Sequence, residues 1–153
     1  MSRTTLRFLA AAAVLFALEA RAPLHAQLEI GTWVQRSGPS KDMMLKIEAC
    51  CHGGRRLSYM LAGNPDVMLQ LESALDGSEA PVLSKGKPTG ETMAIKRVDQ
   101  YHVVNTLKMD GKQFGTSTAT LSPDGKTLTV ETDITFAAGG QAIGKQKEVW
   151  IKK

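Results

Sequence analysis

The most reactive side chains in this sequence are adjacent: Cys50, Cys51 and His52. A thiolate beside an imidazole can bind a soft metal ion or act as an activated nucleophile. Adjacent residues of an extended strand point to opposite faces, so the two thiols would not converge on one tetrahedral metal ion. Three arrangements remain open: one thiol in the core and the other exposed or bonded to a second chain, a vicinal disulfide, or a metal site. We favour the first arrangement and expect no metal.

No other group of residues indicates catalysis. After residue 26 the histidines are His52 and His102, and neither has a serine, cysteine or carboxylate at a recognised catalytic spacing. Asp110 and Asp124 could form an acid–base pair, but each begins an Asp-Gly turn, which is a structural reason for an aspartate there. No glycine-rich segment joins a strand to a helix, as a nucleotide phosphate site requires. We therefore expect a protein that is not an enzyme, with no catalytic residues and no cofactor.

The remaining candidates are apolar side chains that could surround a small ligand. Methionine adapts to ligands of irregular shape, and it also fills protein cores. The methionines after residue 26 are Met43, Met44, Met60, Met68, Met93 and Met109. The aromatic residues there are Trp33, Tyr59, Tyr101, Phe114, Phe136 and Trp150. So few aromatic side chains give no stacking platform for bases, which argues against nucleic acid as a partner.

Composition and charge limit the class of protein further. The chain has 153 residues, of which 42% are hydrophobic and 22% are charged, enough for one domain with one core. The formal charge is +4, and it falls to +2 (16 basic against 14 acidic residues) without residues 1–26. Such a small excess does not favour nucleic acid or an anionic membrane surface as the main partner.

The first 26 residues have the pattern of a secretory signal peptide. Arg3 and Arg7 precede an apolar run of eleven residues, 8–18. A helix of that length would reach roughly 16 Å, about half the thickness of the hydrocarbon core of a bilayer, so we do not expect it to span a membrane. Small residues suit a peptidase that cleaves after Ala26. The mature chain, residues 27–153, would then be periplasmic or extracellular, without a stable membrane anchor.

Turn signals recur along the rest of the chain at nearly even spacing. They are Gly53-Gly54, Asn64-Pro65, Asp76-Gly77, Lys87-Pro88, Asp99-Gln100, Asp110-Gly111, Asp124-Gly125 and Gly139-Gly140. Asp-Gly and Gly-Gly favour tight hairpins because these turns need positive φ, which glycine adopts without a Cβ clash. The intervals leave segments of about nine residues, the length of a strand rather than of a helix.

The segments between the turns alternate apolar and polar residues, as strands with one buried face do. Segments 45–51 and 127–136 show the alternation most clearly. Segment 66–75 also has apolar residues at helical spacing, but Asp76-Gly77 follows at hairpin distance and favours a strand. The sequence therefore predicts an all-β domain, an antiparallel up-and-down meander of about 8–10 strands. So many strands are expected to close into a barrel or to collapse into a sandwich, and closure would remove the exposed edges.

Several motifs resemble those of known barrel proteins. Gly31-Thr-Trp33, at the start of the first expected strand, resembles the Gly-x-Trp opening of lipocalins and of fatty-acid-binding proteins. The rest of the likeness lies in Lys96-Arg-Val-Asp99, Met109-Asp-Gly-Lys112, Ser122-Pro-Asp-Gly-Lys-Thr-Leu-Thr-Val130 and Val149-Trp-Ile-Lys-Lys153. These stretches are similar to the second half of small secreted lipocalin-like bacterial proteins of uncharacterised function. The resemblance implies a calycin-like barrel over residues 27–153 and a secreted protein.

The chain also departs from both families. It has no Thr-Asp-x-Arg element or terminal helix of the lipocalin kind, and no two lid helices after the first strand as in a fatty-acid-binding protein. It has no evident pair of basic residues for a buried carboxylate, because Arg97 is the only arginine after Arg56.

A barrel of this size either fills with side chains or leaves space for one small ligand. We predict the second case, a non-enzymatic carrier of a small apolar molecule. Its wall would include Trp33, Tyr59, Met93, Phe114, Phe136 and Trp150. The alternative is a structural or interaction module of the cell envelope with a filled barrel and no ligand. Such a module would pair with its own copy through a strand edge or through Cys50 or Cys51.

Overall fold

The computed structural model describes residues 28–40, 42–138 and 142–153. The expected signal peptide, residues 1–26, and the expected turn at Gly139-Gly140 lie outside these residues. The strands are β1 (Gly31–Ser37), β2 (Met43–Cys50), β3 (Gly54–Leu61), β4 (Asn64–Ser73), β5 (Asp76–Ser84), β6 (Lys87–Arg97), β7 (His102–Met109), β8 (Lys112–Leu121), β9 (Thr127–Ile134) and β10 (Gly144–Lys152). A short 3-10 turn, η2 (Cys51–Gly53), joins β2 to β3.

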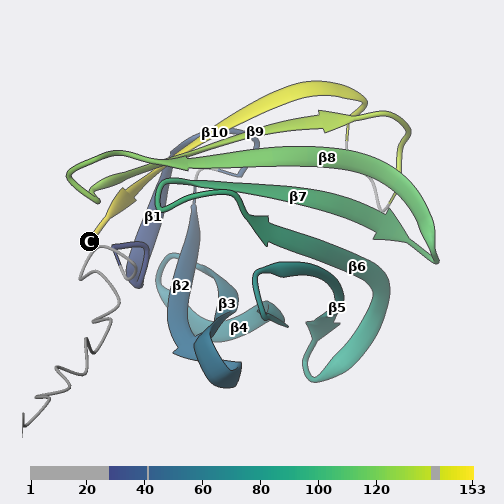
Figure 1. The fold of residues 1–153 in the computed structure, drawn as a ribbon, viewed down its shortest axis with the longest axis horizontal. Coiled ribbons are helices and arrows are strands. Elements are labelled where there is room, and N and C mark those ends of the chain that lie inside the picture. The colour runs from purple at the N-terminus through teal and green to yellow at the C-terminus, as the bar shows by residue number, and fades with distance from the viewer. Residues whose placement is uncertain (1–27, 41, 139–141) are drawn as a thin grey trace, which may run out of the picture.

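The ten strands form one closed antiparallel barrel in which each strand pairs with its neighbours in sequence. The barrel closes where β1 pairs with β10, with Trp33 opposite Lys152 and Gln35 opposite Trp150. In Figure 1, β7 to β10 lie side by side across the top, and β2 to β5 curve below them. The predicted all-β meander and its closure into a barrel are confirmed.

The strands form where apolar and polar residues alternate, because one face of each strand turns into the barrel. In β2, Leu45 and Ile47 are buried and Lys46 between them is exposed. The ambiguous segment 66–75 lies mostly in β4, so the prediction of a strand there is also confirmed.

Three expected turns occur one or two residues earlier than predicted. Asn64, Asp76 and Lys87 are the first residues of β4, β5 and β6 rather than turn residues. The chain reverses at the residues before them, among which Lys85 has φ 49° and Gly86 has φ 77°. Tight hairpin turns need positive φ at one or both central positions, here also at Gly63 and Leu75, and the turn signal marks this region without fixing the exact pair.

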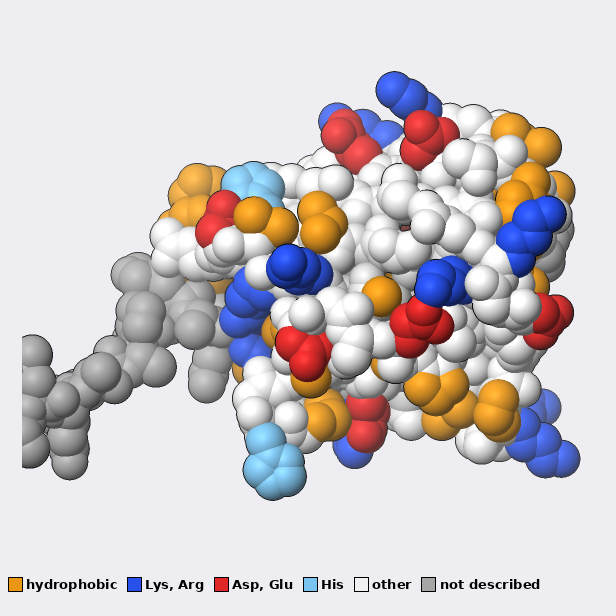
Figure 2. Space-filling view, turned by 45° about the vertical axis from the view of Figure 1, so that its right-hand side comes forward, with side chains coloured by type: hydrophobic (Ala, Val, Ile, Leu, Met, Phe, Trp, Pro, Cys, Tyr) orange, Lys and Arg blue, Asp and Glu red, His pale blue; other side chains and the backbone are white. Residues whose placement is uncertain are grey.

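Buried side chains line the barrel in three clusters rather than filling it. Trp33, Phe114 and Leu71 are the largest fully buried side chains, one in each cluster. Outside, charges of both signs are interspersed on the face shown in Figure 2. Among the residues that the structure describes, no helix is long and apolar enough to cross a bilayer.

Candidate functional site

The barrel encloses a cavity of about 700 Å³. Its wall is mainly apolar and takes side chains from every strand. Aliphatic residues of the wall include Leu45, Ile47, Leu57, Leu69, Leu71, Val82, Ile95, Val103, Leu107 and Val130. A volume of this size is typical of sites that hold one small molecule.

Four of the six residues predicted to contact a ligand line this cavity: Tyr59, Met93, Phe114 and Trp150. The edge of the Tyr59 ring meets Trp150, with ring centroids 6.4 Å apart. Contact with a ligand remains a prediction for all four residues. The remaining two predicted residues, Trp33 and Phe136, do not line the cavity.

Trp33 and Phe136 have structural surroundings instead. Trp33 is fully buried, and its indole N–H donates to the backbone oxygen of Glu29 at 2.9 Å. Phe136 packs edge-on against Phe114, and the Lys112 ammonium lies 4.4 Å from the centre of its ring. The sequence could not separate these two from the cavity wall because the strand register decides which side chains face inward.

Two arginines converge on one carboxylate at one end of the cavity, although the sequence showed no evident pair of basic residues for a buried carboxylate. Arg55 of β3 donates from Nε to Glu29 Oε1 at 2.9 Å, and Arg97 of β6 forms an ion pair with the same oxygen. The Arg55 side chain is only 7% exposed, and it also donates to the backbone oxygen of Gly54 at 2.8 Å. The expectation that the chain lacks a pair of basic residues for a buried carboxylate is therefore wrong. We call Glu29, Arg55 and Arg97 the arginine cluster.

The segment before β1 is held against this end of the barrel. Besides the contacts of Glu29, Lys152 Nζ donates to the backbone oxygen of Leu28 at 2.8 Å. These contacts come from strands β1, β3, β6 and β10. Residues 28–30 thus close the barrel at the end where the arginine cluster lies.

Two carboxyl groups face the cavity away from the arginine cluster: Glu91 on β6 and Glu148 on β10. Burial raises the pKa of each above its usual value. Trp150 opposes the shift at Glu148, because its indole N–H donates to Glu148 Oε2 at 3.1 Å. Burial, and then the charges of Glu148 and Glu91, raise the pKa of the Tyr59 phenol, so both carboxyl groups act on the same part of the cavity.

A row of uncharged polar side chains crosses one wall of the cavity. Asn105, Ser117, Thr132 and Gln146 are register partners on β7 to β10, and all four line the cavity. We call these four residues the polar row. Asn105 Nδ2 donates to Ser117 Oγ at 2.7 Å, but Asn105 Oδ1 is buried without a hydrogen-bond partner.

The sequence analysis missed both the arginine cluster and the polar row. The signal for the row was polar residues at positions that strand alternation turns inward, such as Asn105 and Ser117. The arginine cluster had no local signal, because Glu29 is 26 residues from Arg55 and 68 residues from Arg97 in the chain.

Cys50 and Cys51 are joined in a vicinal disulfide at the end of the β2–β3 hairpin, outside the core. The arrangement that we favoured, one thiol in the core and the other exposed or bonded to a second chain, is therefore wrong. Both sulfur atoms lie near a carboxylate oxygen of Glu72, with the three atoms within 4.8 Å of one another. A disulfide sulfur is not a thiolate, so these atoms do not form a thiolate metal site in this state.

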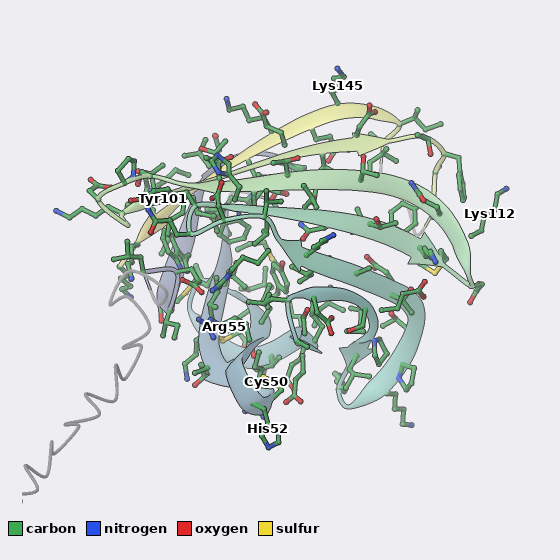
Figure 3. The ribbon with its side chains drawn as sticks, viewed as in Figure 1. Cys50, His52, Arg55, Tyr101, Lys112 and Lys145 are labelled. Atoms are coloured by element: carbon green, nitrogen blue, oxygen red, sulfur yellow. A yellow bond between two sulfur atoms is a disulfide. The ribbon has the colours of Figure 1, made fainter. Side chains whose placement is uncertain are left out.

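The histidines and aspartates considered for catalysis do not form a catalytic group: His52 and Asp124 lie in turns, and His102, the first residue of β7, lines the rim of the cavity beside Asp99. His52 projects from the tip of the hairpin at Cys50, away from the barrel (Figure 3). His102 Nδ1 lies 2.9 Å from Asp99 Oδ1, and both residues are substantially exposed. Asp124 Oδ1 accepts from Ser122 Oγ at 2.6 Å and from the Lys126 backbone N–H, which stabilises its turn.

No protein-family model matches this chain, and no curated protein matches it.

Proposed function

We propose that this chain is an exported, non-enzymatic protein that binds one small, mainly apolar molecule inside its barrel. The observation that carries the proposal is the unfilled cavity of about 700 Å³. Its wall is mainly aliphatic, with the aromatic groups of Tyr59, Phe114 and Trp150 among the apolar side chains. Apolar ligands leave water favourably for such a surface, and a few polar groups orient them.

The alternative function, an interaction module with a filled barrel, has less support. A filled barrel would leave no continuous space between its inward side chains, whereas this barrel keeps a cavity bounded by all ten strands.

A neutral fluorescent probe, N-phenyl-1-naphthylamine, tests the proposal with the purified protein. We expect its fluorescence to rise and to saturate at one probe per chain. Ala119 faces the cavity, and the Ala119→Phe variant should fill part of it and weaken binding by at least about tenfold, or ~1.4 kcal/mol.

The matched control is Thr118→Phe, which adds a ring at the adjacent, outward-facing position of β8. This variant should bind the probe as the wild type does. Binding that does not saturate, or an equal loss in the two variants, would place the probe outside the barrel and contradict the proposal.

A further inference from the structure

The cavity differs in charge along the barrel. Strand β6 carries Arg97 at its last residue and Glu91 near its middle, and six residues of extended chain, roughly 20 Å, separate them. Both side chains line the cavity. A ligand in this space therefore meets basic groups in one region and acidic groups in another.

The basic region already holds a carboxylate. Glu29 Oε1 accepts from both Arg55 and Arg97, and its side chain is only 16% exposed. An anionic ligand would have to displace this carboxylate, together with the segment that carries it. The chain thus supplies its own anion at the place where an anionic ligand would otherwise be attracted.

The acidic region differs from the basic one in its ion pairs. Among the described residues, no lysine or arginine forms an ion pair with Glu91 or Glu148. Both carboxyl groups are half-buried, and burial raises the pKa of each, so a positive charge nearby would favour their ionised forms.

Two buried polar atoms of the cavity wall make no short hydrogen bond. One is the acceptor Asn105 Oδ1 in the polar row, and the other is the donor Gln35 Nε2, whose residue is only 2% exposed. Gln35 and Glu148 both lie against Gly38. A Cβ atom at Gly38 would be 2.5 Å from Gln35 Nε2 and 3.0 Å from Glu148 Cγ, so the two side chains are neighbours. A buried polar atom without a partner is costly, so each of these atoms favours a ligand that completes its hydrogen bonds.

We propose that the ligand of this cavity is an amphipathic amine, whose ammonium group lies at Glu148 and Glu91 against the polar row and whose apolar part lies along the aliphatic wall. This inference rests on the proposed function and adds the chemical class of the ligand.

An ammonium group fits this region better than the other common polar groups do. It carries three donors and no acceptor, so it can serve the Glu148 carboxylate and a neighbouring acceptor of the wall together. A carboxylate would be repelled by Glu148 and Glu91, and an alcohol would leave their charges without a counterion. The Gln35 side chain already acts on Glu148 and lowers the pKa of its carboxyl, so it stays beside the carboxylate that the ammonium group would approach.

Three probes of equal chain length separate these classes: dodecylamine, 1-dodecanol and dodecanoate, each titrated into the purified protein at neutral pH below its aggregation concentration. The change in the fluorescence of Trp33 and Trp150 or the heat of binding gives the dissociation constant. We expect dodecylamine to bind at least about tenfold more tightly than either of the other two.

The variant Glu148→Gln keeps the shape of the side chain and an oxygen for the Trp150 indole. It should weaken dodecylamine binding by at least about tenfold and change 1-dodecanol binding by less than about threefold, because only the charge is removed. Glu91→Gln should act in the same direction. Glu131→Gln, on the outer face of β9 with its side chain 65% exposed, should leave all three constants unchanged.

The outcomes separate the two proposals. Tight binding of 1-dodecanol with no preference for the amine would overturn the amine and keep the apolar carrier. Tightest binding of dodecanoate, or an amine affinity that Glu148→Gln leaves unchanged, would also overturn the amine. Failure of all three amphiphiles and of the neutral probe to bind would overturn both proposals.

Discussion

Trp33 is fully buried but lies outside the cavity wall, so its role is in stability. It packs in the cluster that contains Leu45 and Trp150, under the segment that carries Glu29. We expect Trp33→Ala to lower the free energy of unfolding by about 3–5 kcal/mol, as truncation of a buried aromatic side chain does. Denaturant unfolding measures this loss, and a shift smaller than ~1 kcal/mol would contradict the assigned role.

Phe136→Ala is the control for this measurement, because Phe136 is only half-buried and also lies outside the cavity wall. It should cost about 1–2 kcal/mol, in line with the smaller area that it buries. Probe binding by Trp33→Phe, a milder change that keeps an aromatic ring, should match that of the wild type.

Glu148 makes the stability of the protein depend on pH. Its pKa in the folded protein is raised above the ordinary value of 4.5, so the folded state holds its proton to a higher pH than the unfolded state does. The folded state is therefore favoured most below pH 4.5, and this contribution is lost as the pH rises through the raised pKa. At pH 8 the ionised carboxylate, facing Glu91 and the Tyr59 phenol, destabilises the fold.

We therefore expect Glu148→Gln to be more stable than the wild type at pH 8 and the difference to shrink as the pH falls towards 4.5. Carboxyl groups whose pKa is lowered, such as Asp99 and Asp124, titrate alike in both proteins and cancel in the comparison. Thermal unfolding over this pH range measures the difference. A variant that is less stable than the wild type at pH 8 would show that the buried charge is compensated.

At the scale of one strand, β3 presents two successive arginines to opposite faces. Arg55 points inward to Glu29 with its side chain 7% exposed, and Arg56 pairs outside with Glu72, where the side chains are 43% and 47% exposed. We expect Glu29→Ala to cost about 3 kcal/mol, because it removes the carboxylate that two inward guanidinium groups share. Glu72→Ala should cost at most about 1 kcal/mol. Equal costs in denaturant unfolding would show that burial does not separate the two ion pairs.

The strands themselves could be predicted because their signal is local. Alternation in segments such as 45–51, and turn residues at even intervals, depend only on neighbours in the sequence. The error of one or two residues at Asn64, Asp76 and Lys87 arose because the turn signal does not identify the pair with positive φ. The number of strands left a barrel or a sandwich open, and the resemblance to lipocalin-like proteins favoured the barrel.

The candidate site was less accessible to prediction because it depends on pairs of strands. Tyr59, Met93, Phe114 and Trp150 were found by residue type alone. Glu148 becomes a site residue only because the register of β10 against β1 places it beside Gln35. The vicinal disulfide was left open but not favoured, because Cys51 leaves strand geometry for the left-handed region with φ 49°. A strand pattern predicts no such departure.

At the scale of the whole molecule, the segment before β1 completes the barrel. Residues 28–30 carry the Leu28 oxygen that Lys152 binds and the Glu29 carboxylate that Arg55 and Arg97 share. The expected cleavage after Ala26 leaves this segment intact, with Gln27 as the first residue of the mature chain. Cleavage only a few residues later would remove the partner of both arginines.

Processing and folding therefore make one joint prediction about the mature terminus. Mass spectrometry of the protein recovered from the cell envelope or the medium should show a chain that begins at Gln27, and no chain that begins beyond Leu28. Loss of Glu29 would leave Arg55 and Arg97 without the carboxylate that they share. This loss should cost several kcal/mol, about the order of a broken buried ion pair. A shortened chain that begins at Ile30 should accordingly unfold at lower denaturant concentration than the chain that begins at Gln27. An intact Met1 terminus in the cytoplasm would contradict export. A mature chain that begins at Ile30 and is equally stable would show that the segment does not close the barrel.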